Sequence, residues 1–381
     1  ICLESDKMTE LKRKIDKFLL DWRNSKTRKP LIIKGARQTG KTTSIEKFGK
    51  ENYKSFIEIN FVSMPEYKTI FNEGYTVDNI IKNISLHNGN FEFIPNDTLI
   101  FFDEMQEFPD VATSLKFFCI DGRFDVICSG SLMGINYQEI HSNSVGYKED
   151  YTMRSLDFEE FLWAKGYKDG QIEDLFTCMK EIKPLTNTQY NVMMSNFNDY
   201  MITGGMPEVV SMFIDNKNFS GVLDKQKSLL LDYEEDITKY AGGLDKSKIL
   251  VAYQKIKVFL GNDNKKFQIT KLKDGARNRE YIGVVDWLDK AGIVNVSYSL
   301  DHLELPLKVN YNPDNYRLYF GDTGLLIGSL DEESQNDLRN NQNFGTYKGA
   351  LYENIVAEML TKAGFEPVSY THLTLPTTSR V

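Results

Sequence analysis

A glycine-rich loop near the start of the chain combines the residue types that bind a phosphate chain. Residues 35–42 read GARQTGKT, which fits the pattern G-x-x-x-x-G-K-T. Glycines let the backbone turn so that its N–H groups reach phosphate oxygens, the lysine adds positive charge, and the threonine hydroxyl is a ligand for Mg²⁺. The pattern predicts a nucleotide-binding loop that consists of Gly35, Ala36, Arg37, Gln38, Thr39, Gly40, Lys41, Thr42 and Thr43.

Two acidic residues supply the second half of this chemistry. Asp103 and Glu104 directly follow the apolar run LIFF at 99–102. A strand-end carboxylate in this class holds the metal and its water shell, so we predict Thr42 and Asp103 as the Mg²⁺ ligands. Glu104 is then placed to polarise the attacking water, while Lys41 contacts the β- and γ-phosphates. The two motifs together predict a nucleoside triphosphatase core that uses ATP and Mg²⁺.

The elements that must position these residues alternate between strands and helices. A short β-type run at 30–34 precedes the loop and a helix-like stretch at 42–50 follows it. Strand-like runs at 55–60, 98–104 and 124–131 alternate with helical patterns at 76–86 and 111–119. This alternation predicts an α/β domain with a parallel, doubly wound sheet, on which ligands bind at the carboxyl ends of the strands. A helix predicted over 8–24 has one apolar face, which we expect to pack on this domain.

Polar residues near these strand ends leave alternatives open. Ser129 and Ser131, at the end of the run 124–131, could sense the γ-phosphate or orient water, and a simple turn explains them equally well. Gln106 could contact the nucleotide or a partner, or cap a helix.

The second half of the chain has a different pattern. Residues 157–239 are rich in helical periodicity, and GGMP at 204–207 predicts a helix break that acts as a hinge. Helices predicted over 249–260 and 277–291, followed by strands over 293–300 and 306–311, give a winged-helix order. Arg277 and Arg279 open the second helix and could reach DNA, but a winged helix that only packs between domains fits better, because the region is not basic.

Composition limits the class of protein. With 41% hydrophobic and 26% charged residues among 381, the chain has a globular composition and should form two or three domains. A net charge of −8 argues against a surface wholly covered by nucleic acid. Four cysteines without C-x-x-C spacing are typical of reduced thiols, and no apolar run reaches membrane-spanning length. We therefore expect a cytoplasmic protein with no membrane partner.

Seven segments, in this order, resemble one known family. They are GARQTGKTT, LIFFDEMQ, VICSGS, LDFEEFL, YMITGGMPEVV, FGDTGLL and GALYENIVAEML. They resemble the bacterial and archaeal AAA-type ATPases with a C-terminal DUF4143 domain, over nearly the whole chain. The resemblance implies an AAA+-like P-loop core, a helical lid, a winged helix and a C-terminal restriction-endonuclease-like fold. Within it, Lys41 and Thr42 match the Walker A pair, Asp103 and Glu104 the Walker B pair, and Ser129 a polar sensor.

The chain departs from the family pattern in two places. Gly146-Tyr147 stands where many members have Gly-Arg, so an arginine role would fall to Arg154, to Arg277 or to a neighbouring subunit. Glu353 lies in the helix that opens the nuclease-like fold, but the later acidic positions are missing. We therefore expect no DNA cleavage by that route, because the metal site would lack most of its carboxylates.

These observations predict five segments and one leading function. The segments are a P-loop ATPase core at 8–155, a helical lid at 156–244, a winged helix at 245–312, a partial DUF4143 endonuclease-like segment at 313–367 and a non-native tail at 368–381. The leading function is ATP hydrolysis that drives a conformational switch relayed to the winged-helix and DUF4143 region. The alternative is a nucleotide-gated regulator with little turnover that binds DNA or a protein. A protein client and a homo-oligomer are further candidate partners.

Overall fold

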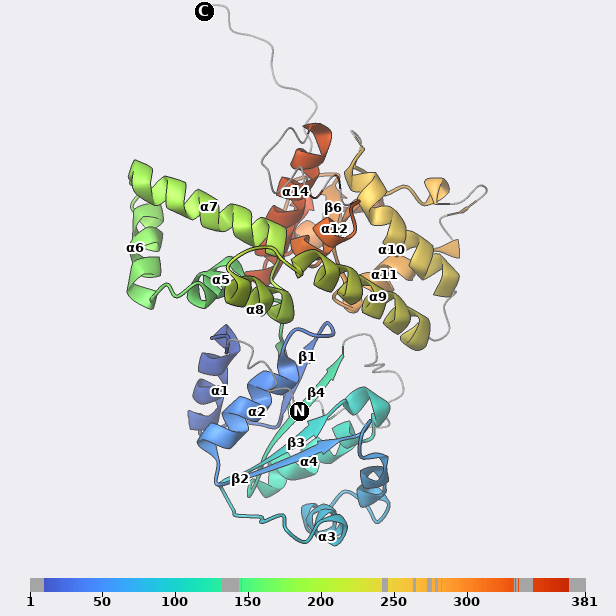
Figure 1. Cartoon of the computed structure of the whole chain (residues 1–381). Coiled ribbons are helices and arrows are strands. Elements are labelled where there is room, and N and C mark those ends of the chain that lie inside the picture. Colours follow the sequence, from blue (N-terminus) through green and yellow to red (C-terminus); the bar gives the residue numbers. More distant parts are fainter. Residues whose placement is uncertain are drawn as a thin grey trace, which may run out of the picture. The chain divides into compact units, whose positions relative to one another are not determined.

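The chain divides into two compact units. The first consists of Ile1–Tyr190 and Gly205–Ser220, and the second of Asn191–Gly204 and Gly221–Val381. Figure 1 shows the elements of both units. The computed structural model describes residues 10–131, 144, 146–241, 246–262, 265–272, 276–277, 280–281, 283–331, 333, 335 and 345–369.

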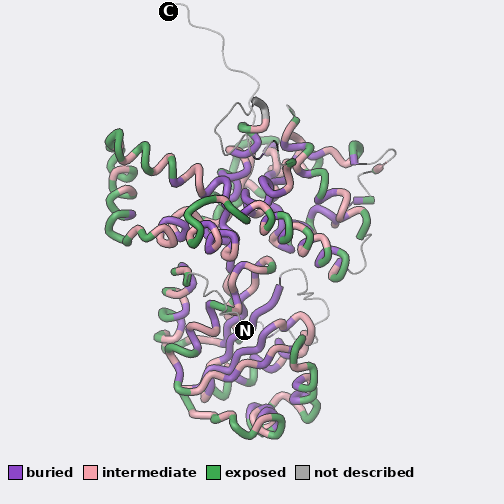
Figure 2. The backbone as a smooth tube through the Cα atoms, in the orientation of Figure 1, coloured by how far each residue is buried: buried purple, intermediate pink, exposed green. Residues whose placement is uncertain are grey.

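The first unit is built on a five-stranded sheet. Its strands are β1 (Leu31–Gly35), β2 (Ser55–Asn60), β3 (Thr98–Asp103), β4 (Asp125–Ser131) and β5 (Glu149–Thr152). They lie in the order β2-β3-β4-β1-β5, and every pair is parallel. All of β3 is buried, as Figure 2 shows for the centre of this sheet. Parallel strands covered on both faces read as continuous apolar runs, which explains TLIFF in β3. The predicted parallel α/β fold is confirmed.

Helices cover both faces of this sheet. The helical elements of the first unit are α1 (Lys14–Asn24), α2 (Lys41–Asn52), η1 (Pro65–Phe71), α3 (Val77–His87), η2 (Met105–Glu107), α4 (Val111–Asp121), α5 (Phe158–Ala164), α6 (Asp169–Lys180) and α8 (Pro207–Asn216). Leu31 and Ile33 share one core cluster with side chains of α1 and α2. Ile32, which points to the opposite face, packs with side chains of α3 and α4. The apolar face predicted for the first helix thus packs on this domain.

The first helix is shorter than its apolar period predicts. We expected a helix over 8–24, but α1 begins at Lys14, and residues 10–13 precede it without helical structure. Residues 8 and 9 lie outside the described residues. Arg13 has extended backbone angles, φ −125° and ψ 151°, and its N–H donates to the Asp16 carboxylate at 3.0 Å. The Asp16 carboxylate satisfies the Arg13 N–H, so Arg13 can stay extended as the N-cap residue. The helix therefore begins at the next residue, Lys14.

The second unit combines helices with a small sheet. Its helical elements are the end of α7 (Asn187–Thr203), α9 (Val222–Tyr240), α10 (Lys246–Leu260), η3 (Ile269–Lys271), α11 (Val284–Lys290), η5 (Leu307–Asn310), α12 (Thr323–Gly328) and α14 (Gly345–Lys362). The strands are β6 (Val294–Leu300), β7 (Tyr311–Phe320) and β8 (Val368–Ser369), in the order β7-β6-β8. The β6–β7 pair is antiparallel and the β6–β8 pair is parallel.

Two elements predicted in this unit differ from the structure. The helix predicted over 277–291 begins only at Val284, because Gly283 at its N-cap has a left-handed φ of 86°. The strand predicted over 306–311 is the short helix η5, and β7 follows it over Tyr311–Phe320. The domain boundary predicted at 312/313 stays a prediction. Val368 and Ser369, predicted to begin a non-native tail, pair with β6.

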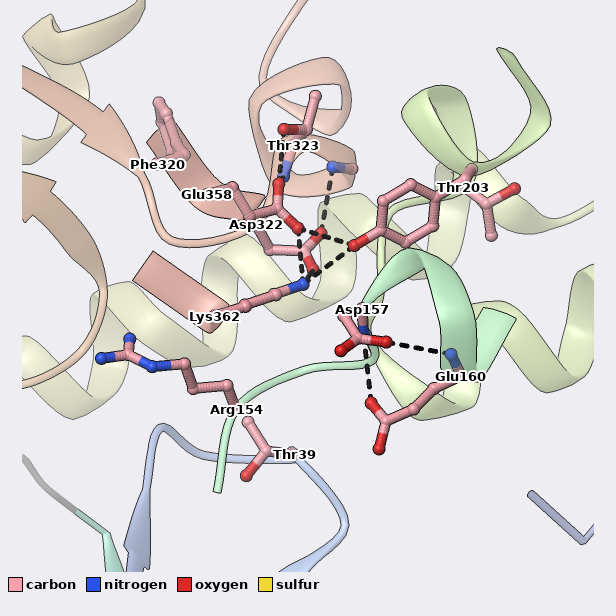
Figure 3. Close-up of polar contacts among 12 residues, drawn as sticks. Thr39, Arg154, Asp157, Glu160, Thr203, Phe320, Asp322, Thr323, Glu358 and Lys362 are labelled. Atoms are coloured by element: carbon pink, nitrogen blue, oxygen red, sulfur yellow. Dashed lines mark hydrogen bonds and ion pairs between the residues drawn. The ribbon is translucent and has the colours of Figure 1, made fainter. Parts of the chain in front are cut away.

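A buried polar cluster holds the end of α14 in the second unit. Glu358 accepts hydrogen bonds from the Thr323 N–H at 2.6 Å and from the Tyr200 hydroxyl at 3.1 Å. The Lys362 ammonium lies 2.5 Å from Glu358 and 3.7 Å from Asp322 (Figure 3). The side chains of these three charged residues are at most 4% exposed. One ammonium therefore faces two buried carboxylates.

Candidate nucleotide-binding site

The loop between β1 and α2 needs glycine at two positions. Gly40, the N-cap of α2, has a left-handed φ of 90°. A Cβ at Gly35 would lie 2.1 Å from the carbonyl oxygen of Met153, the residue after β5. β5 runs beside β1, and its hydrogen bonding continues from the Met153 N–H to the Lys34 carbonyl at 2.7 Å. The packing of the two strands thus explains the first glycine, and the tight turn explains the second.

The Lys41 ammonium closes the loop from within. Its Nζ donates to the carbonyl oxygens of Gly35 at 3.2 Å and Ala36 at 2.8 Å, and its side chain is buried. The Thr39 hydroxyl also donates to the Ala36 carbonyl, at 3.0 Å. These contacts fold the loop back onto the Lys41 side chain. Of the other predicted loop residues, Arg37 and Thr43 are exposed, while Gln38 and Thr42 are partly buried.

Three side chains converge on Asp103 at the carboxyl end of β3. The Thr42 hydroxyl donates to Asp103 Oδ2 at 3.2 Å, and the Asn60 amide donates to the same oxygen at 3.1 Å. The Ser129 hydroxyl donates to Asp103 Oδ1. The parallel register places Asn60 opposite Asp103, and β4 contributes Ser129 from the other side. The structure therefore brings together the predicted metal ligands, Thr42 and Asp103, with Ser129.

Glu104 leaves the strand in a conformation unusual for a residue with a side chain. Its φ is 55°, in the left-handed region, so the chain turns sharply after Asp103. Gln106 donates to Glu104 Oε2 through its amide nitrogen and accepts from the Ser131 N–H at 3.2 Å. Gln106 thus links the ends of β3 and β4. The Ser131 hydroxyl is buried and has no hydrogen-bond partner among the described residues.

Negative charge gathers on this side of the sheet. Burial raises the pKa of Glu58 on β2 above its ordinary value, and the carboxylates of Glu46 and Asp103 raise it further. The Lys50 ammonium acts in the opposite direction and lowers the pKa of Glu58. Within the described part of the chain, no group of three or more His, Cys, Asp or Glu side chains is arranged to hold a metal without further ligands. A metal here would need oxygens from a nucleotide or from water.

The arginines considered from the sequence lie in different settings. Arg154 follows β5 in the first unit, where its backbone carbonyl accepts a hydrogen bond from Arg13 at 2.7 Å. Arg277 precedes α11 and is not part of that helix. Arg279 lies outside the described residues. Arg277 therefore does not open α11, and a role of Arg277 and Arg279 in DNA binding stays a prediction.

Glu353, in α14, is held by basic and phenolic groups. The Lys265 ammonium lies 2.7 Å from its Oε1, and Arg317 and Tyr319 donate to its Oε2 at 2.9 and 3.2 Å. A carboxylate neutralised in this way suits a structural ion pair better than a metal site.

Sequence reasoning missed two residues of the site. Asn60 ends the strand predicted over 55–60, and this position could have indicated a site residue. Polar residues at the carboxyl ends of adjacent parallel strands lie close together, as Asn60 and Asp103 do. Arg13 lies within the helix predicted over 8–24, and nothing in its local sequence indicates the contacts that it makes with residues 39, 154 and 160.

Comparison with known proteins gives two family matches. Residues 27–162 match the model of an AAA domain, and residues 194–336 match that of a domain of unknown function, DUF8612. No curated protein matches the chain. Among helices of the described residues, none has the length and hydropathy needed to cross a membrane.

The chain also resembles several solved structures at low identity. A Walker-type ATPase of Pyrococcus abyssi is 11% identical, with 84% of this chain and 96% of that chain covered and a TM-score of 0.47. The RuvB Holliday junction branch migration motor of Thermotoga maritima is 10% identical, with coverages of 88% and 96% and a TM-score of 0.34. Drosophila ORC bound to DNA is 13% identical, with coverages of 87% and 95% and a TM-score of 0.30.

The family match agrees with the geometry of the first unit. A parallel five-stranded sheet carries a glycine-rich loop after β1 and an aspartate at the end of β3, as expected of a P-loop nucleotide-binding domain. The DUF4143 assignment stays a prediction, since the matched C-terminal family is DUF8612. The chain thus contains an AAA-type P-loop ATPase domain in its N-terminal part, followed by a DUF8612 region.

Proposed function

We propose that the chain binds Mg²⁺ and ATP at the loop 35–43 and hydrolyses the nucleotide. The observation that carries the proposal is the approach of Thr42 Oγ1 to Asp103 Oδ2, which lie 3.2 Å apart where the loop enters α2. Hydroxyl and carboxylate oxygens are the hard ligands that Mg²⁺ prefers, so these donors fit the ion. When bound, Mg²⁺ would neutralise charge on the β- and γ-phosphate oxygens.

Lys41 and the start of α2 would bind the phosphates. The Lys41 ammonium now lies against the carbonyls of Gly35 and Ala36, and phosphate oxygens would compete for the same donor. The first N–H groups of α2 lack partners within the helix, and its dipole favours an anion at this end. The loop therefore offers both a charge and several backbone donors to one phosphate chain.

Glu104 would act on the attacking water, and Ser129 on the metal ligand Asp103. Glu104 follows the metal-binding aspartate directly, and its carboxylate would orient and polarise the attacking water. Ser129 donates to Asp103 in the structure, so its hydroxyl supports the metal ligand and would sense its occupancy.

The finer proposal is that hydrolysis drives a conformational switch. The second part of the chain follows a break at Gly204-Gly205, and we assign residues 156–244 to a helical lid and 245–312 to a winged-helix domain. The support for a relay is that Leu156, just before α5, donates its N–H to the Gly205 carbonyl at 2.7 Å. A movement of α5 would thus be passed directly to the chain at the break.

One observation favours the alternative of a nucleotide-gated regulator with little turnover. The Gln106 amide occupies one oxygen of Glu104, which leaves this carboxylate less free to accept a proton from water. If this contact persists with ATP bound, a DNA or protein ligand would be needed to release Glu104. Replacing Gln106 by alanine should then raise the basal rate of hydrolysis.

The test compares binding and hydrolysis in the full chain. Wild-type protein should hydrolyse ATP only with Mg²⁺, Lys41→Ala should lose nucleotide binding, and Glu104→Gln should bind ATP but turn over about 10²- to 10⁴-fold more slowly. Phosphate release measures turnover, and a fluorescent ATP analogue measures binding. ATP binding without hydrolysis in wild type would favour the regulator, and equal turnover in Glu104→Gln would remove the role assigned to Glu104.

A further inference from the structure

A buried arginine connects the loop 35–43 with the segment before α5. The Arg13 side chain is 6% exposed, and its guanidinium donates in three directions. Nη1 donates to the Thr39 carbonyl at 2.9 Å, Nη2 to the Arg154 carbonyl at 2.7 Å, and Nε to Glu160 Oε1 at 3.1 Å. Each of the three acceptors comes from a different segment of the first unit, so Arg13 joins α1, the loop and α5.

The contact with Thr39 determines the orientation of one peptide group in the loop. Because a trans peptide is planar, its carbonyl oxygen and the next N–H point in opposite directions. When the Thr39 carbonyl points at Arg13, the Gly40 N–H points away from Arg13. Gly40 has a left-handed φ of 90°, a conformation that glycine adopts without strain. The Arg13 guanidinium gives the Thr39 carbonyl a fixed partner, and this contact holds the Gly40 N–H in one orientation.

Glu160, which accepts the Arg13 Nε–H, is itself fixed by further hydrogen bonds. Glu160 also accepts the Lys14 N–H at 2.7 Å, and its other oxygen accepts the Asp157 N–H at 3.0 Å. The Asp157 carboxylate in turn accepts the Glu160 N–H at 2.9 Å, which completes a capping box at the start of α5 (Figure 3). Glu160 is 5% exposed. The buried charge of Arg13 is thus paired with a carboxylate that is itself hydrogen-bonded.

Only arginine can make this set of contacts. Its planar fork presents several N–H groups at fixed angles, whereas the lysine ammonium is a single point at the end of a flexible chain. A lysine at position 13 would keep the positive charge but could not reach the Thr39 and Arg154 carbonyls and Glu160 together.

We propose that Arg13 is a positioning residue for the phosphate-binding loop. It holds the Thr39–Gly40 peptide so that the Gly40 N–H donates to a phosphate oxygen, and it ties this geometry to the start of α5 through Glu160. The inference rests on the proposed ATP binding at this loop. It adds a residue outside the glycine-rich motif, 26 positions before Thr39 in the chain, to the parts that determine nucleotide affinity.

The test measures nucleotide affinity in matched arginine variants of the full chain. Arg13→Lys should bind ATP and ADP about 10- to 100-fold more weakly than wild type, because an aligned backbone donor to a charged phosphate is lost. The matched control is Arg28→Lys, since Arg28 also pairs with a carboxylate in the same unit, that of Asp125, at 2.7 Å. Its affinity should stay within about twofold of wild type, because Arg28 does not contact the loop.

A second variant and a rescue separate positioning from folding. Glu160→Gln leaves Arg13 in place but removes the charge that aligns it, so nucleotide affinity should fall less than in Arg13→Lys. In Arg13→Ala, added guanidinium should restore part of the ATP affinity, which a loss of folding would not allow. Circular dichroism and thermal melting of each variant without nucleotide show which ones are folded at the assay temperature.

The outcomes are distinct. If wild type binds no nucleotide, the proposed function and this inference both fail. If wild type binds ATP and a folded Arg13→Lys binds it equally well, the inference alone is overturned, and Arg13 only joins α1 to α5. Weaker binding in Arg13→Lys, unchanged binding in Arg28→Lys and rescue of Arg13→Ala by guanidinium would together establish the positioning role.

Discussion

Replacing Lys362 by methionine should destabilise the second unit strongly. Lys362 is the ammonium that faces the buried carboxylates of Glu358 and Asp322, and methionine has a similar length without the charge. Removing one partner of a buried pair costs about 3–5 kcal/mol of unfolding free energy, because the remaining charge is left uncompensated. For a unit of this size, that corresponds to a fall in Tm of roughly 6–20 °C.

The chain contains a matched control for this change. Lys290 pairs with Asp286 at the same i,i+4 spacing on α11, at 2.7 Å, but the two side chains are 75% and 62% exposed. Exposed helical pairs of this kind contribute about 0.3–0.5 kcal/mol. Lys290→Met should therefore shift Tm by no more than about 2 °C. Scanning calorimetry of wild type and both variants gives the comparison.

The pH dependence provides an independent check. Burial raises the pKa of Glu358 above its ordinary value, while Lys362 lowers it. A folded carboxyl with a raised pKa binds protons that the unfolded chain has released, so stability falls as pH rises between the unfolded and folded pKa values. Without Lys362 the pKa of Glu358 rises further, and the deficit of Lys362→Met should shrink as the pH is lowered from about 8 to about 5.

Two results would refute this reasoning. A Tm for Lys362→Met equal to that of Lys290→Met would mean that the buried carboxylates need no cation. A deficit that stays constant from neutral to acid pH would mean that the loss comes from packing and not from charge.

Three further predictions concern the first unit. Gly205→Ala should lower the free energy of unfolding by about 1–3 kcal/mol in a denaturant melt, because its Cβ would lie 2.0 Å from a backbone carbonyl oxygen. The control Gly89→Ala should be nearly neutral, because no atom lies within 4 Å of its Cβ. Cys128 is fully buried and its pKa is raised by burial, so a thiol reagent at about pH 8 should label it only after unfolding, as peptide mass mapping would show. Asn60→Asp places a second carboxylate beside Asp103, and the two negative charges repel each other. The Tm of this variant should therefore fall in the presence of a chelator and recover with Mg²⁺. A Tm that does not depend on Mg²⁺ would count against a metal site there.

Local patterns in the sequence were enough to propose the centre of the candidate site. The spacing of Gly35, Gly40 and Lys41 is contained in one turn, so the sequence alone indicates the loop. Asp103 is recognisable because it ends a run of apolar residues that a buried parallel strand requires. These signals depend only on neighbours in the chain.

Contacts between distant segments were harder to predict. The partners of Arg13 lie 26, 141 and 147 positions away, so its role and the late start of α1 depend on the folded structure. The helix predicted over 277–291 failed for a local reason, since the apolar period of α11 does not show that Gly283 takes a left-handed conformation. Periodicity shows which face of a helix is buried better than it shows where the helix begins.

The strand order has a consequence for synthesis of the protein on the ribosome. β1 lies between β4 and β5, whose residues leave the ribosome long after residues 31–35. The nascent chain must therefore carry the glycine-rich segment without its neighbouring strands until residues 125–152 have emerged. Pairing between such distant segments is slow, because a long loop must close first. During translation, the apolar residues of β1 are thus a natural target for chaperones, and the nucleotide site cannot assemble before β4 has been made.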